Sequence, residues 1–267
     1  MQTNTQNLNQ NQLITMQPET VRTKKPAPQN LITCSRLPHA EKMAIFNQRI
    51  IRVLRFLIDE NYSSLENIAR LLNVPKQTSS RICRHLCDKG YLNRVEVDIG
   101  LARSISVFQP TNTGIMFALY ENEDIPELRE VNRVNPATVY HDLKLQQIRL
   151  NLEVQGYTNF QSSWQLSRIL KKRNEKVPTI PDYTCFDPED NKIAIEYERT
   201  IKSRKRYQEI IGQYMDIKER GIIKKVIYYT EPGFASKLQH LFGSIEFIYR
   251  KGKTEKYLNN TNFFTFL

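Results

Sequence analysis

Three carboxylates in the second half of the chain have the spacing of a catalytic cluster. Asp182 begins the segment DYTCFD, and Glu196 and Glu198 lie in the segment KIAIEYE, which follows after the turn residues PEDN. Both segments have the composition of strands, so we expect a β-hairpin. Side chains alternate along a strand, which places Glu196 and Glu198 on one face, and the hairpin brings Asp182 close to Glu196.

Converging carboxylates suit a hard divalent cation. Oxygen ligands without His or Cys favour Mg²⁺ or Mn²⁺, and we expect Asp182 and Glu196 to be the metal ligands. A cation held there would polarise a phosphate and orient a water for phosphodiester cleavage. Basic residues on both sides of the hairpin favour a nucleic-acid substrate: Lys171, Lys172, Arg173, Lys202, Arg204, Lys205 and Arg206. The alternative is a solvated strand edge followed by a salt-bridged helix, and the residues alone leave both open.

Residues 45 to 110 contain a second pattern, that of a DNA-binding winged helix-turn-helix. Apolar residues recur at helical spacing in NQRIIRVLRFLIDE and in SSLENIARLLN, where Ser64 is suited to cap the helix. A third helix, PKQTSSRICRHLCDKG, can begin at Pro75 and end at Gly90. Two strand-like runs, YLNRVEV and RSISVFQP, then predict a hairpin. In a winged helix of this plan, the third helix enters the major groove of DNA.

The expected third helix has an outer face suited to DNA. Ile82 and Leu86 mark its core side, whereas the opposite side presents amide, hydroxyl and guanidinium groups, which contact base edges or phosphates. Arginines in the expected wing are positioned to contact phosphate. The predicted DNA-binding residues are Lys76, Gln77, Ser80, Arg81, Arg84, Arg94 and Arg103. A winged helix that binds protein instead of DNA is the alternative.

Length and charge agree with two domains and an anionic partner. The chain has 267 residues and a formal net charge of +11, which suits a partner rich in phosphates. We expect a disordered tail over 1–40, the winged helix over 41–120, a linker over 121–135 and a second domain over 136–267. The cysteines do not form two C-x-x-C pairs, so we interpret them as small core residues of a cytoplasmic protein: Cys34, Cys83, Cys87 and Cys185. No apolar run is long enough to span a membrane.

The second half alternates strands and helices, which predicts an α/β (α+β) fold. Pro181-Asp182, followed after thirteen residues by Glu196-Tyr197-Glu198, resembles the PD-(D/E)XK nuclease motif. The resemblance implies a restriction-endonuclease-like mixed sheet on which Asp182 and Glu196 bind the metal. It also implies a lysine at position 198, where this chain has Glu198, and Lys202 could supply the displaced positive charge. We therefore predict Asp182, Glu196, Glu198 and Lys202 as the catalytic residues.

The order of the two patterns resembles a family of plasmid proteins. A winged helix followed by this motif, with HDL at 141–143 and ERTIKSRKRY at 198–207, is similar to the replication-relaxation proteins and the MobC-class relaxases of mobilisable plasmids. The resemblance implies a relaxase that recognises a transfer origin in double-stranded DNA and nicks one strand to start conjugative mobilisation. It also implies relaxosome proteins and a conjugative coupling protein as partners. Two alternatives stay open: a non-catalytic plasmid replication or transcription regulator with an inactive nuclease-like domain, and a nuclease that makes double-strand breaks.

A few residues near these motifs have two interpretations each. Tyr207 could be a nucleophile, but it lies on an apolar helical stripe, which favours packing. The nuclease resemblance implies an extra acidic residue on the first helix of the second half, so Asp142 or Glu153 could complete the site or be a cap or surface residue. Trp164 could belong to the core or stack on a base.

Overall fold

The computed structural model describes residues 37–98, 104–119, 125–126, 128–129, 135–258 and 262–267. The chain forms two compact units, Met1–Met43 and Ala44–Leu267. Most of the expected tail and linker lie outside the described residues, as do Cys34 and Arg103.

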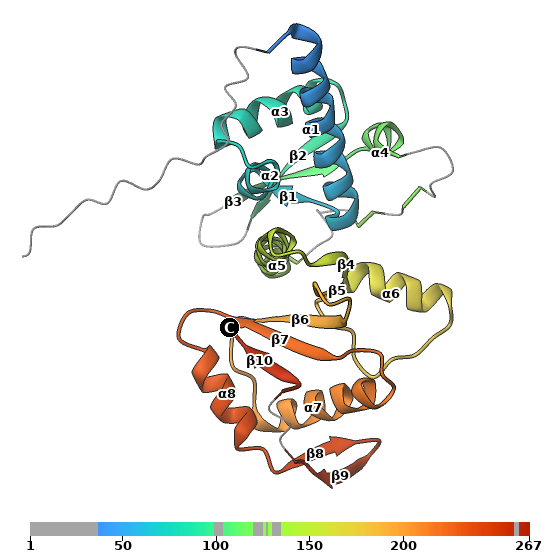
Figure 1. The fold of residues 1–267 in the computed structure, drawn as a ribbon, viewed down its shortest axis with the longest axis vertical. Coiled ribbons are helices and arrows are strands. Elements are labelled where there is room, and N and C mark those ends of the chain that lie inside the picture. The colour runs from blue at the N-terminus through green and yellow to red at the C-terminus, as the bar shows by residue number, and fades with distance from the viewer. Residues whose placement is uncertain (1–36, 99–103, 120–124, 127, 130–134, 259–261) are drawn as a thin grey trace, which may run out of the picture. The chain divides into compact units, whose positions relative to one another are not determined.

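The first described elements are three helices and a small antiparallel sheet (Figure 1). The strands are ordered β1-β3-β2, with Ser63 paired to Phe108 and Val95 paired to Val107. The elements are α1 (His39–Glu60), β1 (Ser63–Ser64), α2 (Leu65–Leu72), α3 (Lys76–Asp88), β2 (Leu92–Asp98), β3 (Ser104–Pro110) and α4 (Asn112–Ala118).

The helix ends follow from capping residues in the sequence. Ser64 caps α2, because its side chain accepts a hydrogen bond from the backbone N–H of Asn67 at 3.2 Å. Asn73 ends α2 in the left-handed region at φ 50°. Pro75 precedes α3, and Gly90 follows it at φ +70°, so the predicted helix ends are confirmed.

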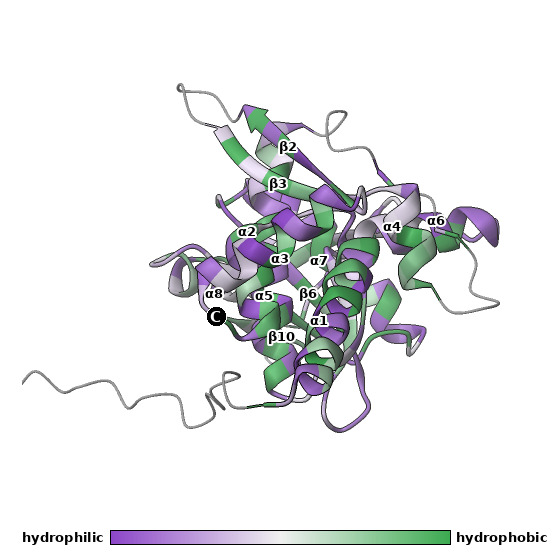
Figure 2. Ribbon diagram, turned by 90° about the horizontal axis from the view of Figure 1, so that it is seen from above, coloured by the Kyte–Doolittle hydropathy of each residue, from purple (hydrophilic) through white to green (hydrophobic). Residues whose placement is uncertain are grey.

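Apolar side chains on α1, α2 and α3 form one core. Val53 and Leu57 from α1 pack with Ile68 from α2 and with Ile82 and Leu86 from α3, and each is buried. Figure 2 shows that α1 carries both hydrophobic and hydrophilic stretches, as a helix does when one side is buried. The core side predicted for α3 is therefore confirmed at Ile82 and Leu86.

The second half is built on a mixed five-stranded sheet in the order β10-β7-β6-β5-β4. The pairs β4–β5 and β5–β6 are antiparallel, whereas the pairs β6–β7 and β7–β10 are parallel. Its elements are α5 (Pro136–Val154), β4 (Thr158–Ser162), α6 (Ser163–Lys172), β5 (Tyr183–Phe186), β6 (Lys192–Glu198), α7 (Arg204–Glu219), β7 (Lys225–Thr230), α8 (Ala235–Gly243), β8 (Phe247–Arg250), β9 (Lys253–Lys256) and β10 (Phe264–Phe266).

Helices cover both faces of this sheet. Ile195 of β6 packs on one face in a cluster with Leu145 and Leu152 of α5. Its neighbour Ala194 faces the other side, in a cluster that contains Tyr214 of α7. The fold is therefore mixed α/β with a mixed sheet.

The structure adds three strands that we did not anticipate from the sequence. β4 and β10 extend the sheet at its two edges, and β9 pairs with β8 in a separate ribbon. Helix α6 begins with a capping box, because the Ser162 side chain accepts from the backbone of Gln165 while the Gln165 side chain accepts from the backbone of Ser162.

Candidate active site and nucleic-acid interface

Strand pairing brings Asp182 and Glu196 together. Tyr183 of β5 pairs with Ile195 of β6, so the residues just beyond this pair, Asp182 and Glu196, are neighbours. A carboxylate oxygen of Asp182 also accepts a hydrogen bond from the backbone N–H of Tyr197 at 2.8 Å. This bond fixes Asp182 beside the strand that carries both glutamates.

Glu196 is held between Asp182 and α7. The Tyr214 hydroxyl, on α7, donates a hydrogen bond to its carboxylate. Burial raises the pKa of Glu196 well above its usual range, and the nearby charge of Asp182 raises it further. A carboxylate pair of this kind must be compensated by a bound proton or by a cation.

Glu198 shares the face of Glu196, as the strand alternation predicts, but has a different partner. Its side chain is 8% exposed and forms an ion pair with the ammonium group of Lys202. The charge of Lys202 also lowers the pKa of Glu196, against the effect of burial. Lys202 therefore lies within electrostatic range of two of the acidic residues.

Tyr207 lies in the same region but is fully buried. Its ring packs against Phe242, with ring centroids 5.3 Å apart, and its hydroxyl accepts a hydrogen bond from the backbone N–H of Lys202 at 3.2 Å. These contacts agree with packing rather than with a nucleophile.

His141 on α5 is a neighbour of Asp182 that we did not include in the predicted site. Its Nε2 lies 3.4 Å from a carboxylate oxygen of Asp182 and 3.2 Å from the backbone oxygen of Tyr197. Burial would lower the pKa of His141, but Asp142 and Asp182 outweigh it and raise the pKa to about 10. The only signal for this position in the sequence is that it stands within HDL on an expected helix.

The two further acidic candidates on α5 have different surroundings. Asp142 accepts a hydrogen bond from the Tyr62 hydroxyl at 2.5 Å, and one of its oxygens lies 3.7 Å from Nδ1 of His141. Glu153 instead pairs with Nε of Arg149 at 2.8 Å. Asp142, and not Glu153, is therefore linked to Asp182 through His141.

Two carboxylates provide a minimal set of donors for a divalent cation. Across the described ranges, no group of three or more His, Cys, Asp or Glu side chains is arranged to hold a metal ion. Mg²⁺ is commonly held by one or two carboxylates, with water and substrate phosphate at its other positions. Asp182 and Glu196 offer the hard oxygen ligands that this requires, and a bound cation would compete with the positive charge of His141 beside Asp182.

A small cavity of about 30 Å³ opens beside Asp182. Asp142, Asp182 and Trp164 line it, together with Tyr62 and Arg129. Its volume is enough for one or two water molecules, because one water needs roughly 10–15 Å³ on this measure. The cavity therefore gives water a place next to the candidate ligand Asp182.

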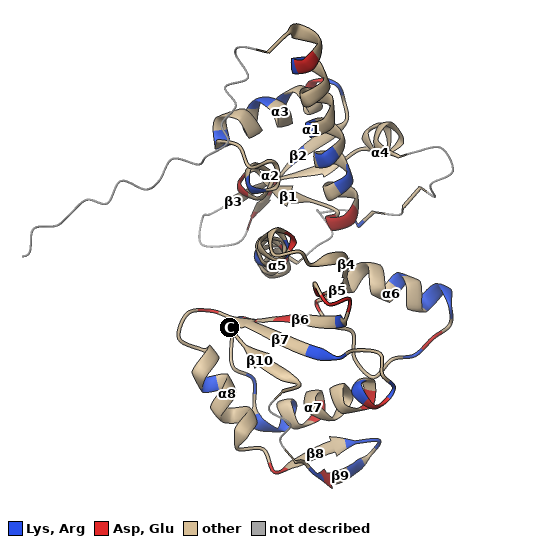
Figure 3. Cartoon of the chain, viewed as in Figure 1, with Lys and Arg blue, Asp and Glu red and all other residues tan. Residues whose placement is uncertain are grey.

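The outer face of α3 is accessible, as expected for a surface that binds DNA. Gln77, Arg81 and Arg84 are exposed and Ser80 is half-buried. Neither Arg81 nor Arg84 forms an ion pair with a described carboxylate, whereas exposed Lys76 pairs with Glu66. Figure 3 shows basic positions along α3.

Arg94, on β2, is exposed but already has partners. Its guanidinium group pairs with Glu96 at 2.9 Å and donates to the Ser106 hydroxyl at 2.6 Å. A phosphate contact by Arg94 would have to compete with Glu96. The other arginine predicted for the wing, Arg103, lies outside the described residues.

The chain matches no family model, no curated protein and no solved structure. None of its described helices is long and apolar enough to cross a membrane.

Proposed function

We propose that this chain is a metal-dependent DNA endonuclease of the relaxase type, which binds a plasmid transfer origin and cleaves one strand there. The observation that carries the proposal is the pairing of Asp182 with Glu196 across the β5–β6 hairpin. In this proposal the mixed sheet is a restriction-endonuclease-like domain, and α1 to β3 form a winged helix that reads duplex DNA. Relaxosome proteins and a conjugative coupling protein are the partners that such an enzyme would have in the cytoplasm.

Each residue of the site has a role that follows from its contacts. Asp182 and Glu196 would hold Mg²⁺ or Mn²⁺, which when bound polarises the scissile phosphate. Tyr214 orients Glu196 through its hydrogen bond, and the backbone of Tyr197 orients Asp182. Lys202, paired with Glu198, provides positive charge where a phosphate would gain negative charge.

A nicking assay with matched acid-to-amide variants tests the proposal. Supercoiled plasmid carrying the cognate origin is incubated with the protein and Mg²⁺ or Mn²⁺, and open circles are counted. We expect the wild type to nick and Asp182→Asn and Glu196→Gln to lose at least about a hundredfold in rate, since each removes a metal ligand. Glu189→Gln, in the exposed turn of the same hairpin, should retain the wild-type rate.

The other outcomes separate the competing functions. If both site variants nick at the wild-type rate, the site is wrong. Linear product in place of open circles would indicate a nuclease that makes double-strand breaks, and not a relaxase. Origin binding without cleavage under any divalent cation would favour the non-catalytic regulator, for which the replacement of the expected lysine by Glu198 is the specific argument.

A further inference from the structure

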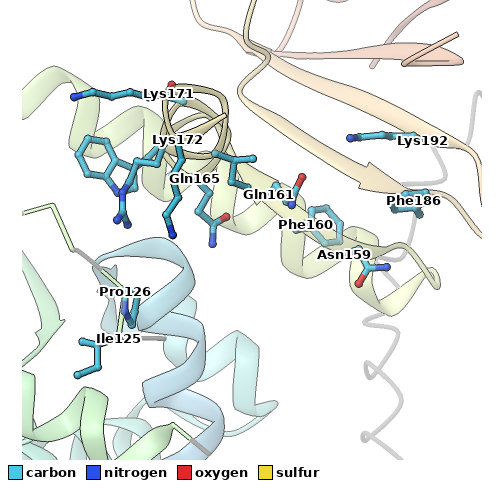
Figure 4. Close-up of a pocket in the computed structure, with 14 residues that line it drawn as sticks. Ile125, Pro126, Asn159, Phe160, Gln161, Gln165, Lys171, Lys172, Phe186 and Lys192 are labelled. Carbon is cyan, nitrogen blue, oxygen red and sulfur yellow. The ribbon is translucent and has the colours of Figure 1, made fainter. Parts of the chain in front are cut away.

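A groove of about 1200 Å³ lies beside α6, outside the residues assigned to cleavage (Figure 4). Its lining comes from β4, from the length of α6, and from Phe186 and Lys192, which are paired at the ends of β5 and β6. Ile125 and Pro126 contribute from the described part of the connection that precedes α5.

The groove is strongly cationic. Every charged side chain among its described lining residues is basic: Arg168, Lys171, Lys172 and Lys192. Lys171 and Lys172 are exposed in the last turn of α6. A ligand that follows the groove would therefore gain by carrying several negative charges.

Aromatic and amide side chains line the groove together with these cations. Trp164 and Phe186 supply half-buried aromatic rings, and Gln161 and Gln165 supply amide groups, whereas the ring of Phe160 is buried against Tyr183. Accessible aromatic rings within a basic channel are typical of sites that stack unpaired bases while contacting the phosphates between them. A base pair in a duplex hides its faces, so this arrangement suits a single strand.

Trp164 links the groove to the candidate active site. Its side chain lines the groove and also lines the small cavity that contains Asp182. Ser163, the residue before Trp164, also contacts Asp182 directly, because its backbone N–H donates to the backbone oxygen of Asp182 at 2.8 Å. A strand lying in the groove would therefore pass Trp164, which also borders the cavity beside Asp182.

From these observations we infer that the α6 groove binds single-stranded DNA and guides the strand to be cut toward Asp182. The inference rests on the proposed function for the fate of that strand, but strand binding itself needs neither metal nor cleavage. The α3 face engages duplex DNA, so the chain has two separate nucleic-acid surfaces.

Trp164 provides a direct measurement, because it is the single tryptophan of the chain. An oligo(dT) of about 12 nucleotides, within the usual range of such sites, is titrated in EDTA while tryptophan fluorescence is recorded. We expect stacking to quench the fluorescence in a saturable manner. Duplex DNA of the same length should bind without comparable quenching.

A charge-reversal pair identifies the groove as the binding surface. Lys171→Glu with Lys172→Glu should weaken oligo(dT) binding by at least roughly tenfold and lower the salt slope by about 1.4, the value for two phosphate contacts. The control pair, Lys253→Glu with Lys256→Glu, makes the same charge change at exposed positions of β9 and should have little effect.

Two results would overturn the inference: absence of quenching by oligo(dT), or equal weakening by the control pair. Neither depends on cleavage, since the titrations contain EDTA. If the protein nicks plasmid but its fluorescence is not quenched by oligo(dT), the proposed function stands and the inference about the groove is wrong. If its fluorescence is quenched but it does not nick plasmid, the groove binds single-stranded DNA and the proposed endonuclease activity is wrong.

Discussion

Glu196 is the residue whose chemistry depends most on its surroundings. Its strand places it on the same side as Glu198, but only Asp182 and Tyr214 bring its carboxyl group into a site. Burial and the charge of Asp182 raise its pKa, so a proton and a divalent cation compete for the same carboxyl oxygens.

This competition predicts that metal affinity depends on pH. Because the pKa of Glu196 is raised, the group keeps its proton to higher pH than an ordinary glutamate, and that proton must leave when a cation binds. Affinity for Mn²⁺ should therefore rise with pH until the pKa is passed, with net proton release on binding. Calorimetry in buffers of different ionisation enthalpy measures this release.

Asp182→Asn is the matched variant for that measurement. It removes the charge that helps to raise the pKa of Glu196, so binding should be weaker and the proton release smaller. Mn²⁺ affinity that stays constant from pH 5 to 8 would contradict the assignment of Glu196 as a ligand.

Arg81 and Arg84 differ from Lys76 in being without a described acidic partner. If both contact phosphate, Arg81→Ala and Arg84→Ala should each lower the slope of log affinity against log salt by about 0.9 on a random duplex. Titrations of a labelled duplex at several salt concentrations measure this slope. The control is Arg220→Ala, at an exposed position after α7, which should leave the slope unchanged. If all three variants lower the slope equally, the effect comes from the net charge of the protein and not from contacts made by α3.

At the scale of elements, the structures that depend on local sequence patterns could be predicted, whereas those that depend on long-range contacts could not. The helices α1 to α3 and the β5–β6 hairpin have strong periodicity or turn signals, and the structure contains them. β10 has three residues and depends on pairing with β7, so no local pattern of its own identifies it. The same holds for His141, whose contact with Asp182 joins residues far apart in the chain.

In helix α5 the apolar stripe identifies only some of the buried residues. Its apolar face, marked by Leu145 and Leu152, covers the mixed sheet. Gln146 and Arg149 are buried as well, because they bond to the first half of the chain. The Gln146 side chain accepts from Ser63 at 2.6 Å and from Asn67 at 3.0 Å. Polar residues at such positions look like surface residues in the sequence alone.

Arg149 connects three elements through one buried ion cluster. Its guanidinium group pairs with Glu60 at the end of α1, and the Tyr183 hydroxyl of β5 donates to the same carboxylate. Arg149→Met should destabilise the protein by about 3–5 kcal/mol, because it leaves the buried Glu60 carboxylate without its cation. Equilibrium unfolding in urea measures the change.

The control for this prediction is Arg206→Met, which breaks an exposed pair with Glu209 and should cost less than about 1 kcal/mol. Adding Glu60→Gln to Arg149→Met should recover part of the lost stability, since it removes the uncompensated charge. If the double variant is as unstable as the sum of the single ones, the cluster does not act through charge compensation.

At the scale of the whole molecule, the sequence indicated two functional surfaces but not their connection. The expected domains share a buried polar network, in which Asn67 donates to the backbone oxygen of Leu143 at 2.9 Å and Tyr62 donates to Asp142. Composition and periodicity cannot reveal such a network, because each partner is an ordinary polar residue locally. The α6 groove escaped prediction for a similar reason, since its lining comes from separate strands and a helix.

The position of Glu60 also bears on how the protein is made. During synthesis, α1 emerges from the ribosome well before Arg149 and Tyr183. The carboxylate of Glu60 therefore has neither of these partners until the later segments have emerged. Contacts between such distant segments form late, because a long loop must close first. The contacts that join α1 to α5 and β5 through Glu60 therefore form after those later segments have been synthesised. A chain truncated before residue 149 would lack the cation that pairs with Glu60, so this carboxylate would stay hydrated and α1 would be less firmly docked.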